Sequence, residues 1–210
     1  MTRAASRPLR ATVARLGLTL GLSLGLSLAL TTPLPAETEL PNFPQVEFTT
    51  TLGSFTVELD TRRAPHTVRN FLALVENGHY EGLIFHRVIQ GFVIQGGGYT
   101  PDFDLRPVET QIINESGNGL SNRRGTIAMA RTNEPHSADS QFYLNLVDNV
   151  SLDPQPTRWG YAVFGSVVRG METVDEIGYV ATSSGGPFER DVPQAPVIIR
   201  EVRLLDPEGG

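Results

Sequence analysis

The chain has 210 residues, of which 40% are hydrophobic and 19% charged, and this is enough apolar material for one globular domain with a packed core. Its 23 acidic and 17 basic residues give a formal charge of -6, and every basic residue is an arginine. Nucleic-acid-binding proteins normally carry a basic surplus, so we expect no nucleic-acid partner. The chain has no cysteine, which excludes disulfides and a lipid-modified N-terminal cysteine.

The first 36 residues have the three parts of a secretory signal peptide. An arginine-rich start precedes the apolar run "LGLTLGLSLGLSLAL", Leu16 to Leu30, and the small-residue exit "TTPLPA" follows it. We expect cleavage after Ala36, which removes residues 1–36. The apolar run has 15 residues, fewer than the ~20 that a membrane-spanning helix needs. An uncleaved membrane anchor is the alternative interpretation.

The chain after Ala36 is strongly acidic. Four of the 17 basic residues lie in the signal peptide, so 13 remain against 23 acidic groups and the charge becomes -10. We therefore expect a soluble exported domain over residues 46–205, periplasmic rather than secreted, although the same leader serves both destinations. Residues 37–45 are polar and proline-rich, which indicates a short lead-in, and residues 206–210 form a C-terminal tail.

The expected domain begins with two strands and a helix. Within residues 46–60, hydrophobic and polar residues alternate on both sides of Leu52-Gly53-Ser54, which predicts two antiparallel strands joined by a tight turn. Pro65 and Gly78 mark the start and the end of the helix that follows. Its apolar residues recur at helical spacing and predict a face that covers a core: Val68, Phe71, Leu72 and Val75.

Short β-rich runs, separated by glycine and proline, fill most of the remaining chain. This spacing favours a closed or nearly closed antiparallel barrel, because closure removes exposed sheet edges. We assign no role to the loops "TPDFDLRPVET" and "SSGGPFERDVPQAP". The runs are "LIFHRVI", "FVIQ", "GTIAMAR", "SQFYLNLV", "YAVFGSVV" and "VIIREVRLL". A second helix is expected in "METVDEIGYV", with an inward face of Met171, Val174, Ile177 and either Tyr179 or Val180.

The stretch "FHRVIQGFVIQGGG", residues 85–98, mixes apolar, β-branched and polar residues. Two short strands on either side of Gly91 would explain the pattern, because side chains alternate between the faces of a strand and a glycine within a strand marks a bend or bulge. The polar residues Arg87, Gln90 and Gln95 would then have a face of their own.

The sequence indicates no conventional acid, base, nucleophile or metal centre. Its four histidines match no ligand spacing. A nucleophile elbow of the form G-x-S-x-G is absent, and the glycine runs "GGGY" and "SGNG" lack the strand-to-helix context of a dinucleotide loop. The carboxylates are scattered along the chain. We therefore expect neither a metal nor a cofactor.

Five segments follow one another in an informative order: "APHTVRNFLALVENGHY", "FHRVIQGFVIQGG", "NESGNGLSNRRGTIAMAR", "DSQFYLNL" and "YAVFGSVVRGMETVDEI". In this order they resemble cyclophilin-type peptidyl-prolyl cis-trans isomerases, and in particular the bacterial exported branch. The resemblance runs from about Val46 to about Leu205. It implies a mainly β fold, a closed eight-stranded antiparallel β-barrel capped by two α-helices, with an active groove on the outer surface.

The resemblance also implies roles for nine residues. Arg87 matches the family's catalytic arginine, and Gln95 matches the glutamine that supports that arginine and the substrate. The other seven match the substrate groove: Phe92 at the floor of the proline pocket, Ala130 and Gln141 facing the substrate, and Val93, Tyr143, Leu152 and Tyr161 as apolar walls.

Some positions depart from the common family pattern. Val93 often corresponds to methionine, Tyr143 to phenylalanine and Tyr161 to histidine, although tyrosine at the last position resembles the bacterial exported members. Ser151 stands where many members carry a tryptophan that helps bind cyclosporin, so we expect weak inhibition unless Trp159 fills the gap. The loop after "QGG" also differs from that of many eukaryotic members, which leaves the substrate preference on that side open.

The resemblance implies an isomerase that acts on X-Pro bonds of unfolded or folding exported proteins. We expect a monomer without a stable membrane anchor once the signal peptide is cleaved. One alternative is a module that binds proline-containing segments, as a chaperone would, with isomerisation incidental. A second alternative is an interaction protein held at the membrane by an uncleaved leader.

Overall fold

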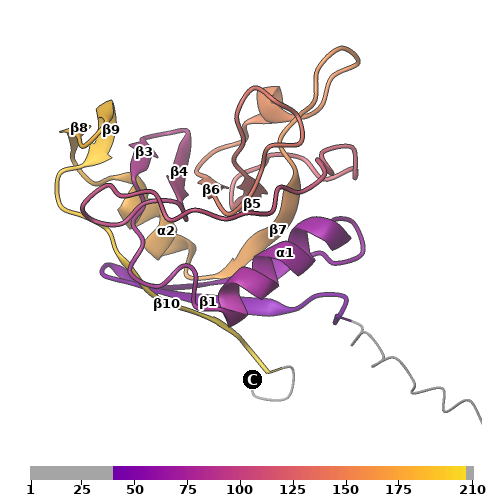
Figure 1. Ribbon diagram of the computed structural model, residues 1–210, viewed down its shortest axis with the longest axis horizontal. Helices are drawn as coiled ribbons and strands as arrows, with labels where there is room; N and C mark the ends of the chain where they lie inside the picture. The colour runs from indigo at the N-terminus through magenta and orange to yellow at the C-terminus, as the bar shows by residue number, and fades with distance from the viewer. Residues whose placement is uncertain (1–39, 207–210) are drawn as a thin grey trace, which may run out of the picture. The chain divides into compact units, whose positions relative to one another are not determined.

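The computed structural model describes residues 40–206, so the expected signal peptide, the first three residues of the lead-in and the last four residues lie outside the described range. Eight antiparallel strands form one curled sheet in the order β10-β1-β2-β7-β5-β6-β4-β3 (Figure 1). Together with two α-helices, these strands confirm the predicted mainly β fold. The strands are β1 (Gln45–Thr50), β2 (Gly53–Leu59), β3 (Arg87–Ile89), β4 (Val93–Gly96), β5 (Thr126–Met129), β6 (Phe142–Asn145), β7 (Val163–Arg169) and β10 (Ile199–Leu204).

The curled sheet is a half-barrel whose edge strands, β3 and β10, are joined only by a short bridge. Ile84, before β3, pairs with Ile198, before β10. Around this pair, the amide of Gly82 donates to the carbonyl of Ile199 at 2.8 Å, and the amide of Ile199 donates to the carbonyl of Leu83 at 2.8 Å. The expected closure is therefore partial, because the edges meet along this one segment and not along the whole of β3.

The inner face of the sheet encloses an aromatic core. Phe142 of β6 is fully buried, and its ring lies 5.4 Å from that of Phe48 and 6.0 Å from that of Phe71, nearly perpendicular to the latter. Phe48 also stacks on Phe55 at 4.7 Å. Burying a side chain of this size stabilises the fold by ~1.5–3 kcal/mol, and paired rings add ~0.5–1.5 kcal/mol. This core fixes the strands that carry the outer face.

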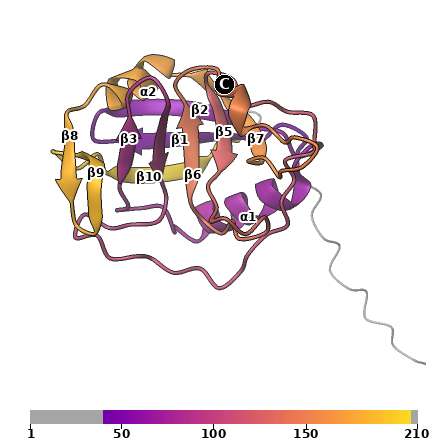
Figure 2. The same ribbon diagram turned by 90° about the horizontal axis from the view of Figure 1, so that it is seen from above.

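Two helices pack against the sheet, α1 (Pro65–Glu76) and α2 (Met171–Gly178), and Figure 2 shows them on opposite sides of the strands. Pro65 opens α1, and Gly78 follows its end with a left-handed φ of 66°. At the end of α2, Val180 packs against the core, whereas Tyr179 is 72% exposed. Within residues 40–206, no helix is long and apolar enough to cross a membrane. The predicted apolar face of α1 is buried as expected, at Val68, Phe71, Leu72 and Val75.

A hairpin replaces the loop expected before the last strand. It consists of β8 (Thr182–Gly185) and β9 (Phe188–Pro193), which form a separate two-stranded sheet beside β3 (Figure 1). The ring of Phe188 lies 5.4 Å from the His86 ring and 5.2 Å from the Tyr99 ring. β8 has no large hydrophobic residue and β9 does not alternate, so the sequence pattern does not predict strands here.

Candidate active site

A row of side chains crosses five strands on the outer face of the sheet. Arg87 of β3 pairs with Gln95 of β4, Gln95 pairs with Tyr143 of β6, and Ala128 of β5 pairs with Tyr143 and with Val163 of β7. Residues directly opposite in an antiparallel ladder share a face, so these five residues form one line, the Arg87 row. The next positions point inward and belong to the core: Val88, Ile94, Leu144 and Ile127.

A chain of hydrogen bonds runs from Arg87 through Gln95 of the row to Gln141. Nη1 of Arg87 donates to Oε1 of Gln95 at 3.4 Å, a long hydrogen bond, and Nε2 of Gln95 donates to Oε1 of Gln141 at 3.2 Å. The Arg87 side chain is 40% exposed, so a ligand can reach the guanidinium. A Cβ on Gly98 would lie 2.7 Å from the Gln141 side chain, and the glycine therefore makes room for this amide.

An apolar cluster lies beside this polar chain and is separate from the aromatic core. Its buried members are Val93, Ala128, Tyr143 and Val163, and partly buried residues pack against them, namely Phe92, Leu120, Ala130, Leu152 and Tyr161. We refer to these nine residues as the outer cluster. Its partly buried members leave apolar surface open to solvent, which a ligand could cover.

The turn between β3 and β4 places Phe92 in the outer cluster. Gly91 has a left-handed φ of 69°, a conformation that favours glycine, and the amide of Phe92 donates to the carbonyl of Ile89 at 3.0 Å. The carbonyl of Phe92 accepts from the amide of Leu146 and from Nδ2 of Asn149, each at 2.9 Å. These bonds fix the backbone from which the Phe92 ring projects.

A buried network of amides lies behind Tyr143. The Tyr143 hydroxyl donates to Oδ1 of Asn122 at 2.6 Å, and Nδ2 of Asn145 donates to the same oxygen at 3.3 Å. Oδ1 of Asp153 accepts from the amide and from Nδ2 of Asn122, at 2.7 and 2.9 Å, and Ser121 donates to the other carboxylate oxygen. This amide network satisfies the one polar atom that the Tyr143 ring carries into the interior.

The electrostatics of the amide network fit these hydrogen bonds. Burial raises the pKa of Tyr143 well above its ordinary value of 10.0, and the nearby Tyr161 and Asp153 act in the same direction. Its hydroxyl therefore stays protonated and donates. Partial burial would raise the pKa of Asp153, but hydrogen bonds from Ser121 and Asn122 outweigh this effect and lower that pKa. Asp153 is consequently a charged acceptor at neutral pH.

Arg131 holds the far side of the outer cluster. Its guanidinium carbon lies 4.5 Å from the centre of the Tyr161 ring. Nε donates to the carbonyl of Gly160 at 3.2 Å, and Nη2 donates to the carbonyl of Trp159 at 2.9 Å. Because the guanidinium is fixed by backbone acceptors, it orients the Tyr161 ring through a cation–π contact.

The structure brings all nine residues singled out in the sequence into two adjoining groups. Arg87, Gln95 and Gln141 form the polar chain, and the other six belong to the outer cluster: Phe92, Val93, Ala130, Tyr143, Leu152 and Tyr161. Ser151 lies next to Leu152 and is exposed. Gln90, which the alternation placed with the polar face, is exposed in the turn outside β3.

Sequence reasoning missed the residues that support the site. Asn122 and Asn145 are fully buried, and Arg131 contacts Tyr161, but none of the three was singled out. Asn145 within "QFYLNLV" is a polar residue in an apolar strand, which is a usable signal, whereas nothing near Arg131 in the sequence indicates its contact.

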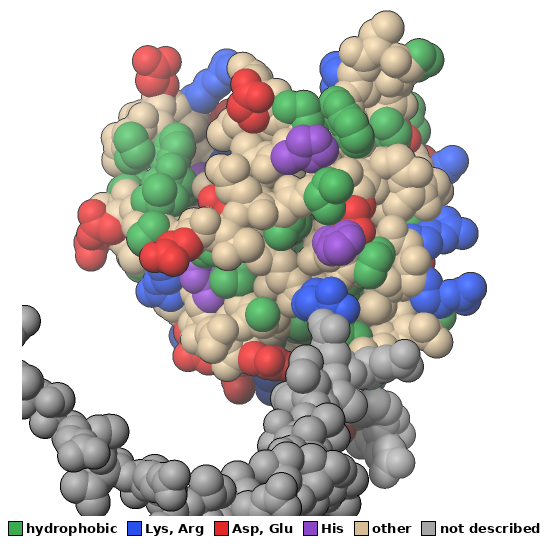
Figure 3. Space-filling view, turned by 45° about the vertical axis from the view of Figure 1, so that its right-hand side comes forward, with side chains coloured by type: hydrophobic (Ala, Val, Ile, Leu, Met, Phe, Trp, Pro, Cys, Tyr) green, Lys and Arg blue, Asp and Glu red, His purple; other side chains and the backbone are tan. Residues whose placement is uncertain are grey.

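Two further candidate sites on the described surface are the histidines and a hollow beside β1. The histidines visible in Figure 3 lie apart from one another, and residues 40–206 contain no group of three or more His, Asp or Glu placed to hold a metal. A hollow of about 890 Å³ is lined by the ends of β7 and β10, the start of α2, parts of β1 and β2, and the segment before β1. Two of its charged side chains, Glu47 and Arg203, pair at 2.7 Å, and no residue of the polar chain or the outer cluster lines it.

Comparison with known proteins identifies the class. The model of the family described as cyclophilin type peptidyl-prolyl cis-trans isomerase/CLD matches residues 45–204. The chain is 50% identical to peptidyl-prolyl cis-trans isomerase cyp18 of Streptomyces antibioticus, over 76% of this chain and 98% of that protein. It is 48% identical to peptidyl-prolyl cis-trans isomerase B of Escherichia coli, over 77% of this chain and 99% of the relative.

A solved structure agrees with these relatives. The crystal structure of a Cryptosporidium parvum cyclophilin type isomerase in the presence of the dipeptide Ala-Pro superimposes with a TM-score of 0.64 at 27% identity, over 77% of this chain and 99% of that one. The chain belongs to the cyclophilin-type peptidyl-prolyl cis-trans isomerase family. It is an enzyme that interconverts the cis and trans forms of peptide bonds before proline, and its substrates are proline-containing peptides.

Proposed function

We propose that Arg87 is the catalytic residue of this isomerase and that the outer cluster binds the substrate proline. The observation that carries the proposal is the Arg87 row, in which a ligand-accessible guanidinium lies in register with Gln95 and Tyr143 beside open apolar surface. The other guanidinium beside this surface, that of Arg131, is already engaged by the carbonyls of Gly160, Thr132 and Trp159.

The chemistry requires only that the twisted amide be stabilised. Resonance between the nitrogen lone pair and the carbonyl gives the peptide bond a rotation barrier of ~18–20 kcal/mol. Halfway through the rotation, the nitrogen has regained its lone pair and can accept a hydrogen bond. The Arg87 guanidinium stays charged at any physiological pH and offers several donors in a fixed fork, so it can donate to that nitrogen.

Arg87 acts together with its surroundings. One charge-assisted hydrogen bond contributes ~1.5–3 kcal/mol, about one to two powers of ten in rate. Apolar walls that exclude water strengthen this contribution, because a preorganised donor is worth more where the dielectric is low. Gln95 receives Nη1 of Arg87 and is itself held by Gln141, so both amides keep the guanidinium oriented.

The outer cluster suits the ring of proline. Phe92, Leu152 and Tyr161 each leave part of an apolar side chain exposed, and the amide of Tyr161 donates to the carbonyl of Leu152 at 3.0 Å, which ties two of these walls together. The related structure obtained in the presence of Ala-Pro supports a small proline-containing ligand.

Replacing Arg87 with alanine separates catalysis from simple binding. We expect kcat/KM for a proline-containing tetrapeptide to fall at least thirtyfold. This loss corresponds to roughly 2 kcal/mol or more, which lies within the range for one charged hydrogen-bond donor. Peptide affinity should change less than about threefold. Arg200→Ala, at an exposed position of β10, is the matched control and keeps full activity. Equal losses of turnover and affinity would instead favour the non-catalytic binding module.

We also propose that the enzyme acts on exported proteins. The support is the arginine-rich start and the 15-residue apolar run of residues 1–36, which have the order of a secretory signal peptide. N-terminal sequencing of the protein from cell fractions tests this proposal. A periplasmic form that starts at Glu37 is the expected result, and a membrane-bound form that retains Met1 would contradict it.

Weak cyclosporin inhibition remains a prediction at Ser151. This residue is exposed within the 3₁₀ turn η1 (Val150–Leu152), next to Leu152 of the outer cluster, and its small side chain covers little surface. We expect Ser151→Trp to tighten cyclosporin binding at least tenfold in a fluorescence titration. Tight binding by the unchanged protein would mean that Trp159, which is 47% exposed, supplies the missing contact.

A further inference from the structure

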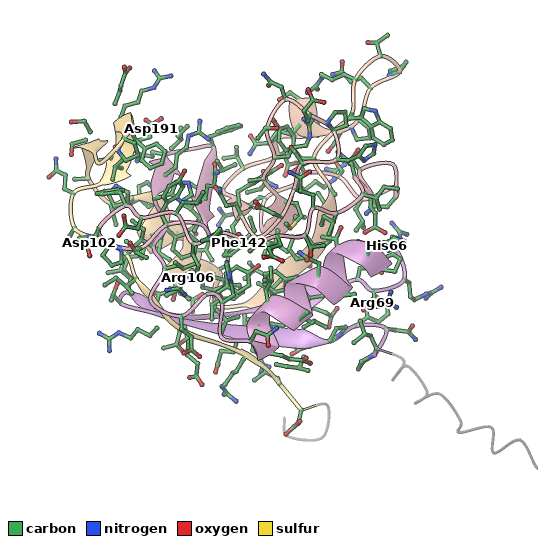
Figure 4. All side chains as sticks on the ribbon, viewed as in Figure 1. His66, Arg69, Asp102, Arg106, Phe142 and Asp191 are labelled. Atoms are coloured by element: carbon green, nitrogen blue, oxygen red, sulfur yellow. The ribbon has the colours of Figure 1, made fainter. Side chains whose placement is uncertain are left out.

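We propose that Asp191, on the β8–β9 hairpin, is a positioning residue that orients Arg87 for catalysis. This inference rests on the proposed catalytic role of Arg87. Oδ2 of Asp191 lies 4.0 Å from Nε of Arg87, and the side chain of Asp191 is only 25% exposed. Figure 4 shows Asp191 on the hairpin, on the side of the molecule where β3 also lies. A segment without an expected role thus places a carboxylate beside the candidate catalytic group.

An aromatic cluster fixes the hairpin against β3. The ring of His86, the residue before Arg87, stacks on Phe188 of β9 with an interplanar angle of 27°. The same His86 ring meets Tyr99 at 4.8 Å, and Phe103 packs against Phe188 at 6.3 Å. His86 is 2% exposed. Because the residues adjoining Arg87 and those near Asp191 share one packed cluster, the distance between the carboxylate and the guanidinium is set by the fold.

The backbone at Asp191 is unusual for a residue with a side chain. Its φ is 67°, in the left-handed region that non-glycine residues rarely adopt, although aspartate and asparagine tolerate it best. The next two residues, Val192 and Pro193, return to the interior and are buried. With this backbone conformation, the Asp191 side chain departs from the regular alternation of side chains between the two faces of β9. Strained backbone conformations of this kind are concentrated at functional positions.

The contacts of the guanidinium indicate what this carboxylate does. Nη1 of Arg87 donates to Gln95, and Nε faces Asp191. Within residues 40–206, no hydrogen bond engages Nη2, so this nitrogen is available to the substrate. The hydrogen bond to Gln95 and the ion pair with Asp191 act on different nitrogens, and together they favour one orientation of the planar guanidinium. Arg190 also approaches Oδ2, at 3.7 Å, but its side chain is 87% exposed and solvent screens it.

The direct test is Asp191→Asn, because asparagine keeps the left-handed backbone and removes only the charge. We expect kcat to fall about threefold to fivefold with KM changed less than twofold, the size of effect typical of a partly exposed ion pair. In a ¹⁵N relaxation measurement, the Nε–H order parameter of Arg87 should fall as well, since the guanidinium has lost one of its two anchors. A loss of fold alone would not move this signal selectively.

A matched control uses the same hairpin. Glu189→Gln removes an equal charge two residues away, at an exposed position, and should leave kcat and the Arg87 signal unchanged. Asp191→Gly, which also suits the backbone, should reproduce the loss seen with asparagine. Wild-type kcat in Asp191→Asn, an unchanged Arg87 signal, or an equal loss in Glu189→Gln would each overturn the inference. The catalytic role of Arg87 fails separately, if Arg87→Ala keeps its activity.

Discussion

The two faces of β4, β5 and β6 carry different kinds of hydrophobic surface on the same strands. On the inner face, Phe142 is enclosed by aromatic rings from β1, α1 and the segments around them. On the outer face, its neighbour Tyr143 is almost as buried, but the hydroxyl is held by Asn122 and the residues around the ring stay partly open. Two consecutive residues of β6 therefore point to opposite faces, one into a closed core and the other into an apolar surface suited to binding.

The difference shows how a barrel supports a site on its outside. The core behind the inner face is almost entirely apolar and needs few polar partners, the Tyr80 hydroxyl donating to the carbonyl of Ser140, whereas an outer apolar patch must be held without being covered. The amide network, anchored on Asp153, does this from below. At the rim, Arg131 holds the Tyr161 ring and Gln95 accepts a hydrogen bond from Arg87. The outer cluster thus depends on hydrogen bonds where the core depends on shape.

Removing Phe142 should break the inner face and leave the outer one working. Phe142→Ala deletes a fully buried ring, and we expect a loss of ~3–5 kcal/mol in the free energy of unfolding, measured by urea denaturation. At low temperature, where the variant stays folded, kcat/KM should remain within about threefold of the wild type. Tyr179→Ala, at a 72% exposed ring, is the control and should cost less than ~0.5 kcal/mol. A large loss of turnover in folded Phe142→Ala would show that the two faces are not independent.

At the edge of the sheet, the aromatic cluster around Phe188 and Tyr99 contains an ionisable ring, that of His86, which makes the stability of this region depend on pH. Burial, and then the nearby Arg87 charge, lower its pKa from 6.5 to about 4. Between these values the unfolded chain binds a proton and the folded chain does not, so stability present above pH 6.5 is lost as the pH falls toward 4. The loss attributable to His86 reaches roughly 3 kcal/mol.

His86→Phe should therefore flatten the stability curve between pH 6.5 and 4, because the ring contacts remain and the titration is gone. Urea midpoints at several pH values measure the effect, with His66→Gln, at an exposed histidine, as the control. Asp153 also has a lowered pKa, but it is present in both proteins and cancels in the difference. Parallel curves for the wild type and His86→Phe would contradict the assignment.

Tyr143→Phe probes the outer face with the smallest change. It removes the 2.6 Å hydrogen bond to Asn122 but keeps the ring, and Asn122 still accepts from Asn145. We expect a stability loss of ~1 kcal/mol and a kcat/KM within about threefold of the wild type. A loss of turnover comparable to that of Arg87→Ala would mean that the hydroxyl takes part in catalysis and not only in support.

Much of the fold was predictable from local patterns. Alternation predicted β1 and β2, helical spacing predicted the buried face of α1, and the polar residues around Gly91 predicted two strands with Arg87 and Gln95 on one face. The family resemblance singled out Arg87, Gln95 and Tyr143 of the Arg87 row but not Ala128 or Val163, because no local pattern reveals which strands become neighbours across a sheet.

The remaining features depend on contacts that are distant in the sequence. In the β8–β9 hairpin, β8 has no hydrophobic residue and β9 does not alternate, and Phe188 of β9 packs against the rings at positions 86 and 99, so the hairpin's own sequence does not predict strands. Asn122 becomes part of the site only when Tyr143 and Asp153 meet it in the folded chain. The partial closure of the barrel likewise depends on where residues 82–85 meet residues 197–199.

The most direct test of the account measures isomerisation on the enzyme itself, under conditions where binding is saturated. NMR exchange spectroscopy on an Ala-Pro-containing peptide, at peptide concentrations far above Kd, reports the interconversion rate of bound cis and trans forms. We expect Arg87→Ala to slow this rate at least tenfold with the peptide still fully bound. An unchanged exchange rate in the bound variant would contradict the central role of the guanidinium.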